Sequence, residues 1–303
     1  MKKIVGLILV LSSIGVSAQT VLASAELEAQ NVDEVRIKGS FVDVYVNKGE
    51  RVYFKGEING SGDEGDYRFD TEIIGSTLVI EVIRERNNVS WKGYNMKESR
   101  IDLTIMDGVS LDIDNSSGDI KVANLRANES RIKATSGDIT LRSVVANLKV
   151  ETSSGDIDID GLTGDSRIES TSGDQKLTST KGNIETRASS GDIDVVEFNG
   201  LVEITATSGD IEIKRGVGRL KVQTSSGSID GSGIELKGNA NFRATSGDVE
   251  IDFINDIDDL SFDLTASSGD LEVGNRSGSR RLMIDKGGIK VTGVTSSGDQ
   301  EYE

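Results

Sequence analysis

The sequence predicts an all-β protein, a single-stranded β-solenoid (β-helix) of about ten 18-residue coils that follow an N-terminal strand-rich cap. Three observations lead to this prediction. A short phrase, Ser-Gly-Asp preceded by Ser or Thr, recurs along the chain at a period close to 18 residues. Apolar residues alternate on both sides of the phrase, as strands with one buried face require. The chain has no proline, a residue that would remove hydrogen-bond donors from a strand ladder.

The first element along the chain is an expected signal peptide at residues 1–18. Lys2 and Lys3 precede an apolar run from Ile4 to Leu11, and small residues precede a cleavage point after Ala18, with a second possible cut after Ala25. The apolar run is shorter than the roughly 20 residues of a membrane span. We therefore expect an exported protein, at the periplasm, cell surface or outside the cell, with no membrane span in the mature chain. A retained, uncleaved anchor is the alternative.

Residues 26–108 are expected to form the N-terminal cap and irregular first coils. The stretches VRIKGSFVDVYV, RVYFKG, TLVIEVI and RIDLTIMD alternate between apolar and polar residues. The first coil of a solenoid exposes an open ladder and its core, so it needs a cap. We expect this segment to continue into the repeats as one domain.

Residues 109–303 are expected to form the repeat solenoid and a C-terminal tail. Apolar residues stand five positions before the glycine of each phrase and two and four positions after it, and a looser line seven positions after it ends at Ile254 and Val294. Across the phrase these positions switch parity, from Val150 to Ile157 for example, so the chain must turn a corner there. The tail TSSGDQEYE repeats the phrase out of register and is expected to close or leave the stack. The predicted corner glycines are Gly118, Gly137, Gly155, Gly173, Gly191, Gly209, Gly227, Gly247, Gly269 and Gly287.

Composition restricts the chemistry. The chain has no histidine and no cysteine, which excludes Ser-His-Asp and Cys-His nucleophiles, ordinary zinc or haem sites, and a lipid anchor on cysteine. The formal net charge is −17 and becomes −19 without residues 1–18, which carry two lysines and no acid. Nucleic acid and anionic lipid surfaces are therefore not expected partners.

The aspartate after each corner glycine is one candidate site. In register these carboxylates would lie about 4.8 Å apart and repel one another by roughly 0.9 kcal/mol in bulk water. Backbone N–H groups, water or nearby cations could offset this repulsion, and a line of calcium ions is the functional alternative. The candidate metal ligands are Asp138, Asp156, Asp174, Asp192 and Asp210.

The second candidate is a loop at 86–100 that combines aromatic and basic residues. Trp91 and Tyr94 with Arg86 and Lys92 suit a glycan or a peptide. The alternative is that Trp91 covers the first coil as an apolar plug.

A non-enzymatic binding or adhesive module at the bacterial envelope is the expected function, with a glycan, a peptide or another envelope protein as partner. A polysaccharide-cleaving enzyme would need only two carboxylates, but the coils from 137 to 227 carry no insertion that could build a groove. A structural or stress-linked envelope scaffold is the other alternative.

The repeated phrases TSGDI and SSGDI at 135–139, 153–157, 189–193 and 207–211, and the opening VRIKGSFVDVYV, give the chain a family resemblance over about residues 31–303. It resembles the bacterial adhesin-type proteins with β-strand repeats, a domain family of unknown function. The resemblance implies a secreted or envelope-facing β-solenoid, right-handed, sometimes tied to envelope stress. It brings no catalytic residues to carry over. No cofactor is expected apart from the calcium alternative.

Overall fold

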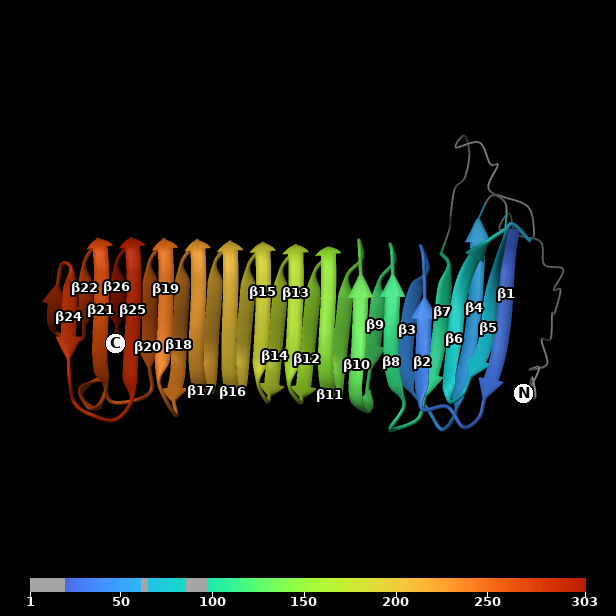
Figure 1. Ribbon diagram of the computed structural model, residues 1–303, viewed down its shortest axis with the longest axis horizontal. Helices are drawn as coiled ribbons and strands as arrows, with labels where there is room; N and C mark the ends of the chain where they lie inside the picture. The colour runs from blue at the N-terminus through green and yellow to red at the C-terminus, as the bar shows by residue number, and fades with distance from the viewer. Residues whose placement is uncertain (1–19, 61–64, 86–97) are drawn as a thin grey trace, which may run out of the picture. The chain divides into compact units, whose positions relative to one another are not determined.

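The computed structural model describes residues 20–60, 65–85 and 98–303 (Figure 1). Within them the regular elements are β-strands, apart from one short 3-10 turn, η1 (Ile257–Asp259). None of the described residues forms a helix with the length and apolarity needed to cross a membrane. The expected signal peptide, residues 1–18, lies outside the described residues. By contacts the chain divides into two units, Met1–Asn147 and Leu148–Glu303.

In the first unit, parallel strands form two ladders, and each predicted corner joins a strand of one ladder to a strand of the other. In one ladder β2 pairs with β6 on one side and β8 on the other, and β10 pairs with β8. In the other, β3 lies between β7 and β9, and the start of β11 pairs with β9. The strands are β2 (Glu34–Lys38), β3 (Asp43–Lys48), β6 (Thr77–Arg84), β7 (Arg100–Ile105), β8 (Ser110–Asn115), β9 (Ile120–Ala123), β10 (Arg126–Ala134) and β11 (Ile139–Ser154).

Antiparallel strands complete the first unit. β4 (Val52–Gly60) pairs with β7 and with β1 (Thr20–Ala29), while β5 (Tyr67–Ile74) pairs with β6. The order in space therefore differs from the order in sequence, because β2 and β3 lie between strands that follow them by dozens of residues.

In the second unit the parallel pairs are offset by 18 residues, so that Val150 pairs with Ile168 and Ile168 with Thr186. The offset lengthens to 20 residues where Val222 pairs with Phe242. The strands are β12 (Ile157–Thr163), β13 (Ser166–Ser172), β14 (Gln175–Lys181), β15 (Ile184–Ser190), β16 (Ile193–Ser208), β17 (Ile211–Ser226), β18 (Ile229–Leu236), β19 (Ala240–Ser246), β20 (Val249–Phe253), β21 (Ser261–Ser268), β22 (Leu271–Val273), β23 (Arg276–Gly278), β24 (Arg281–Ile284), β25 (Lys290–Ser297) and β26 (Gln300–Tyr302).

The corner glycine is required by backbone conformation and by space. Gly191 has φ of 115°, and a Cβ atom there would lie 2.4 Å from the carbonyl oxygen of Gly173 in the preceding coil. A second column of glycines, nine residues after the corner, also has no room for a side chain. A Cβ on Gly200 would lie 2.1 Å from the carbonyl oxygen of Gly182. Between the two, six residues after the corner, the chain adopts a left-handed conformation even without glycine, as at Glu197 with φ of 60°. Each regular coil therefore bends three times.

The predicted inward positions are confirmed along the regular coils but not around Gly287, where Leu282, Ile289 and Val294 are only half-buried. Ile157 and Ile159 are 1% and 0% exposed, and Val150 on the other side of the corner is 0% exposed. The prediction for Ile254 is wrong: its side chain is 66% exposed. The coil ends at Phe253, and the chain leaves it towards η1, whose first turn is capped by the Asp256 side chain.

Two polar residues stand at inward positions and satisfy one another. Gln175 and Thr186 are 1% and 0% exposed, and the Thr186 hydroxyl donates to the Gln175 side-chain oxygen. The Gln175 amide donates to Ser170 Oγ and to the carbonyl of Arg187, both at 2.8 Å. A buried amide is tolerated because its partners are buried beside it.

The predicted path of the C-terminal tail is wrong. The tail lies in register inside the stack: β25 pairs with β19 on one side and β21 on the other, and β26 lies between β20 and β22. Gly298, not Gly287, occupies the corner column, next to Gly247 and Gly269. Tyr302 is fully buried and stacks on Phe253 with ring centroids 6.2 Å apart. β23 and β24, which precede the tail in the chain, pair antiparallel with β22 and β21, respectively.

Candidate functional site

The corner aspartates bond to the backbone of the neighbouring coil. One carboxylate oxygen of Asp156 accepts from the backbone N–H of Asp174 at 2.9 Å, and Asp174 accepts from Asp192 at the same distance. In the same way, Asp192 accepts from the Asp210 N–H and Asp210 accepts from the Ser228 N–H, both at 2.8 Å. In the first unit, Asp119 accepts from Asp138 N–H at 3.2 Å. These hydrogen bonds to ionised acceptors offset the repulsion between stacked carboxylates.

Four of the five predicted metal ligands, Asp156, Asp174, Asp192 and Asp210, stand in this corner column of the second unit, and Asp138 holds the corresponding corner position in the first unit. Within the residues that the structure describes, no group of three or more acidic side chains has the arrangement of a metal site. Calcium binding by the column stays a prediction.

A column of serines precedes the glycines and lies beside the aspartates. In the second unit these serines are exposed and stand in register from coil to coil. Their hydroxyls make no hydrogen bond to the described protein, so their donors and acceptors face solvent. The members are Ser154, Ser172, Ser190, Ser208, Ser226, Ser246, Ser297 and Ser268, in spatial order.

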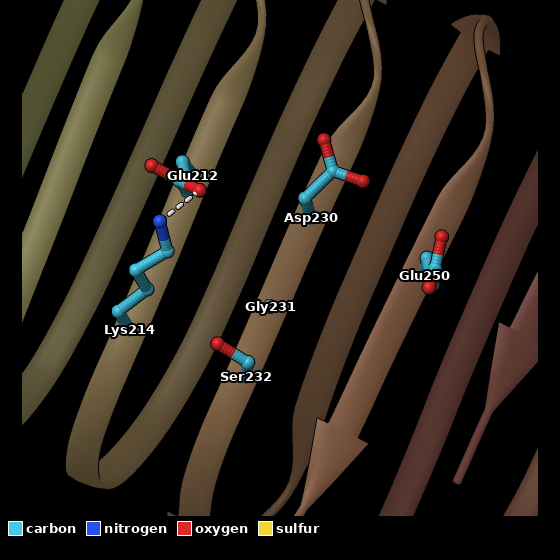
Figure 2. Close-up of a pocket in the computed structure, with 6 residues that line it drawn as sticks. All are labelled: Glu212, Lys214, Asp230, Gly231, Ser232 and Glu250. Atoms are coloured by element: carbon cyan, nitrogen blue, oxygen red, sulfur yellow. Dashed lines mark ion pairs between the residues drawn. The ribbon is translucent and has the colours of Figure 1, made fainter.

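An acidic face, defined here as the outward residues three positions after each corner glycine from Gly191 onwards, runs along the strands that follow the corner (Figure 2). Pairing register makes each member the neighbour of the next. Only Lys214 forms an ion pair with a member, Glu212, within the described residues. In spatial order the members are Asp194, Glu212, Asp230, Glu250, Glu301 and Glu272.

Burial and like charge raise the pKa of several of these carboxyls. Partial burial is the main cause for Asp194, followed by the charge of Glu212. Partial burial also raises the pKa of Asp230, with Glu250 as the next cause. For Glu301, desolvation comes first and the charge of Glu303 second. The face therefore holds its negative charge less readily than separate carboxyls would.

A depression of about 150 Å³ lies on this face where Gly231 replaces the inward isoleucine of neighbouring coils. Glu212, Asp230 and Glu250 stand around it, with Lys214 and Ser232 (Figure 2). Pockets for small organic ligands measure roughly 300–1,000 Å³. This depression suits water, an ion or a single projecting side chain.

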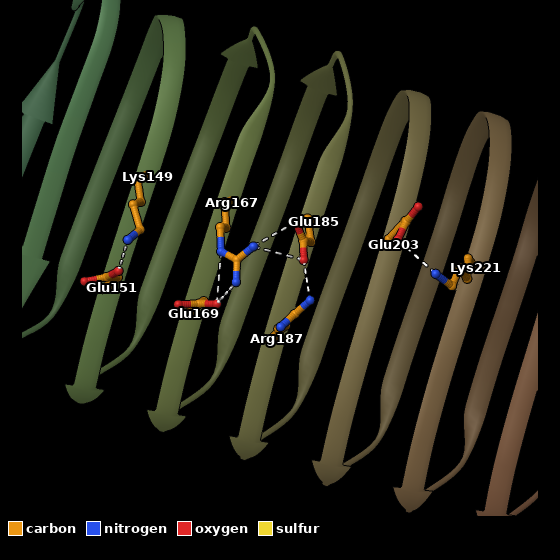
Figure 3. A network of polar contacts seen from close by, with 8 residues as sticks. All are labelled: Lys149, Glu151, Arg167, Glu169, Glu185, Arg187, Glu203 and Lys221. Atoms are coloured by element: carbon orange, nitrogen blue, oxygen red, sulfur yellow. Dashed lines mark hydrogen bonds and ion pairs between the residues drawn. The ribbon is translucent and has the colours of Figure 1, made fainter.

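The strands that precede the corner carry balanced charges instead (Figure 3). Arg167 contacts Glu169 at 2.7 Å and Glu185 of the next coil at 3.2 Å, and Arg187 also contacts Glu185, at 2.6 Å. The first of these contacts is the main cause of the raised pKa of Arg167. These strands therefore contribute little net negative charge to the second unit.

The candidate loop residues Arg86, Trp91, Lys92 and Tyr94 lie outside the described residues. The acidic face and the second glycine column were not anticipated from the sequence. Both carried a signal, since acids recur three positions after the corner glycine and Gly164, Gly182, Gly200 and Gly218 recur nine positions after it.

Comparison with solved structures finds similar chains at low identity. A candidate adhesin from Bacteroides fragilis is 12% identical, with 92% of this chain and 96% of that chain covered and a TM-score of 0.43. A candidate lipid-binding protein from Parabacteroides distasonis is 14% identical over the same shares, with a TM-score of 0.45. A candidate adhesin from Parabacteroides merdae is 13% identical over 94% and 96%, with a TM-score of 0.37. At these values the likeness carries no argument about function.

No curated protein matches this chain. The family model described as Toastrack DUF4097 matches residues 32–214 and 196–301, which together are most of the chain. This repeated β-solenoid-like chain belongs to the Toastrack family, DUF4097.

Proposed function

We propose that the protein is an exported, non-enzymatic binding module of the adhesin type at the bacterial cell envelope, and that it binds through the serine and aspartate columns of its corners. The observation that carries the proposal is the serine column, because exposed hydroxyls without protein partners recur in register at one corner of successive coils. The extent of β1, which begins at Thr20, supports cleavage after Ala18, since a cut after Ala25 would remove six residues of that strand. We also propose that the chain winds as a right-handed solenoid of about ten coils.

The chemistry of the columns favours a polar polymer as partner. Rows of hydroxyls and carboxylates about 4.8 Å apart offer many equivalent weak contacts, which gain affinity together when one chain engages several of them. The negative field of the protein repels anionic polymers. We therefore propose a neutral or cationic glycan, a peptide, or an extended segment of another envelope protein.

The test is a binding assay on a panel of neutral, cationic and anionic polysaccharides and peptides. Changing Ser172, Ser190 and Ser208 together to alanine should weaken binding while the circular dichroism spectrum and the melting temperature stay unchanged. Thr205→Ala with Gln223→Ala is the control, since both residues are exposed on the charge-balanced face. Equal binding by all three proteins would contradict the proposal.

The Trp91→Ala variant tests whether the ligand binds at the loop predicted from the sequence or at the serine and aspartate columns. Loss of binding with the fold intact would place the ligand at Trp91 and Tyr94 and would reject the serine column. Loss of binding together with loss of fold would support Trp91 as an apolar plug.

Calcium is the one cofactor that the corner column could take. Because one oxygen of each aspartate already accepts a backbone hydrogen bond, we expect millimolar calcium to shift the melting temperature only slightly and without a defined stoichiometry. Calorimetry showing several sites of micromolar affinity would contradict this, since such binding adds RT ln(1 + [L]/Kd) of stability.

Polysaccharide cleavage is the second candidate function. Asp230 combines a raised pKa with neighbouring carboxylates beside a depression, a pattern that acid–base catalysis uses. Release of reducing sugar by the protein and not by Asp230→Asn would overturn the non-enzymatic proposal. Absence of both binding and cleavage across the panel would favour the envelope-scaffold alternative.

A further inference from the structure

The last strands of the second unit leave one backbone edge unpaired among the described residues. β24 pairs antiparallel with β21, and the Ala266 N–H donates to the Arg280 carbonyl at 3.1 Å. By antiparallel alternation, Leu282 and Ile284 also bond towards β21, and the backbone groups of Arg281 and Met283 point away from it. The Met283 side chain is 59% exposed. Unpaired strand edges of this kind are templates for pairing with another chain.

Within the described part of the first unit, β5 has a corresponding unpaired edge. β5 pairs antiparallel with β6, and Glu85 N–H donates to the Asp66 carbonyl at 2.9 Å. The same alternation turns the backbone groups of Phe69, Thr71 and Ile73 towards the free edge. Ile73 and Ile74 are 40% and 60% exposed. Large exposed apolar side chains are few in the described chain, and they include members of both edges.

The two edges differ in the charge that is left without an ion pair. β5 holds two carboxylates, Asp70 and Glu72, and one guanidinium, Arg68, which pairs with Asp70 at 2.9 Å. Residues 276–284 hold three guanidiniums, Arg276, Arg280 and Arg281, of which Arg276 pairs with Asp258 and Arg281 with Asp263. Glu72 and Arg280 are both exposed and form no ion pair with the described residues, so their charges are available to a partner.

We propose that copies of this chain associate head to tail, with the edge of β5 in one copy adding to the edge of β24 in the next. The partner is a second copy because the same chain carries both members of a complementary pair. Contacts between like edges are disfavoured, since acidic residues would meet acidic residues and arginines would meet arginines. A contact between two different surfaces is heterologous, so it leads to rings or open filaments rather than to a closed two-fold dimer.

The association is expected to be weak and dependent on salt. β24 and β23 are short, so the shared ladder is short, and the charged groups are exposed to solvent screening. Sedimentation velocity of the purified protein over a wide concentration range should show species larger than a dimer, which decrease as salt is added.

Charge reversal tests both the site and its polarity. Glu72→Arg or Arg280→Glu should each weaken association about fivefold, the size expected when an exposed attraction becomes a repulsion. A mixture of the two variants should recover association, because each copy then meets an opposite charge at both of its edges. Met283→Pro, which removes an outward N–H without removing a hydrogen bond to β21, should also weaken association.

The controls reverse exposed charges on inner strands of each unit, Glu129→Arg on β10 and Arg219→Glu on β17, and should associate as the unchanged protein does. The proposal is overturned by a protein that stays monomeric at all concentrations, in which case the arginines and the short strands serve only to block the edge. It is equally overturned by species that stop at the dimer, by association unaffected by the edge variants, or by a mixture that fails to recover.

Discussion

At the scale of the residue, the repeated aspartate and the repeated isoleucine have different tasks although they are adjacent. Asp156 lies outside the core and accepts a backbone hydrogen bond from the next coil. Ile157 lies inside, with 1% of its surface exposed. The aspartate therefore contributes a hydrogen bond at the surface, whereas the isoleucine contributes buried apolar area to the stack.

Ile157→Asp should destabilise the protein far more than Asp156→Asn. A charge at the inward position loses the burial of the isoleucine and leaves an unpaired carboxylate, a loss of about 4 kcal/mol or more. Asparagine keeps an oxygen that can accept from Asp174 N–H, so its cost should be about 1 kcal/mol or less. Chemical denaturation of both variants measures the difference, and equal losses would mean that the inside and outside faces are wrongly assigned.

At the scale of the element, each coil is held by bends as well as by strands. A Cβ atom on a corner glycine would collide with a carbonyl of the neighbouring coil, so the bend and the stacking distance depend on the same residue. Gly287 has φ of 70° but no atom within 4 Å of the place where a Cβ would stand. Substituting Gly287 therefore tests the energetic cost of a side chain at positive φ, whereas substituting Gly191 adds the cost of a steric clash.

Gly191→Ala should cost more stability than Gly287→Ala. Both changes place a side chain at positive φ, which costs about 1 kcal/mol. Only at Gly191 must the Cβ also displace the Gly173 carbonyl, 2.4 Å away, and with it the adjoining strand pairs. We expect about 3 kcal/mol or more at Gly191 and about 1 kcal/mol at Gly287. Thermal melts of the two variants decide it, and a larger loss at Gly287 would contradict the assignment of the corner.

At the scale of the whole molecule, stability depends on the distribution of carboxylates. The raised pKa values of Asp194, Asp230 and Glu301 mean that their charged forms are less favourable in the folded chain than in the unfolded chain. Asp258 and Asp263 behave in the opposite way, because hydrogen bonds from Arg276 and Lys290 lower their pKa values.

We expect the melting temperature to rise as the pH falls from 7 to about 4–5, because the folded state takes up protons on the acidic face before the unfolded state does. Below that range it should fall, as Asp258 and Asp263 are protonated and lose their ion pairs. Asp230→Asn should raise the melting temperature at pH 7. It should also reduce the increase in melting temperature between pH 7 and pH 4–5. A steady fall from pH 7 to pH 5 would contradict this account.

Deleting residues 290–303 should disrupt the strands between β20 and the deleted segment, not only the end of the chain. β25 and β26 supply a pairing edge to β19 and β20 on one side and to β21 and β22 on the other, whereas β19 and β20 also pair with β17 and β18. Limited proteolysis with mass spectrometry should find cleavage from about residue 254 onwards. Protection of residues 254–289 in the truncated protein would show that these strands pair without the inserted segment.

Much of the local structure follows from the sequence alone. Alternation predicted the inward positions, the change of parity predicted the corner, and glycine at the corner follows from the conformation that the backbone adopts there. These features depend on residues a few positions apart. The aspartate column likewise follows from its place beside the corner, although its backbone hydrogen bonds needed the neighbouring coil.

The order of the coils was decided only by the tertiary structure. Every coil presents nearly the same corner and the same inward residues, so local pairing energy does not favour one neighbouring coil over another. Where the chain doubles back, the order of the strands in sequence does not predict which strands pair. Contacts between distant residues make the choice: Tyr302 stacks on Phe253, and Gly293 leaves the space that the side chains of Gln300 and Tyr302 occupy. The acidic face depends on that choice, because it places Glu301 between Glu250 and Glu272.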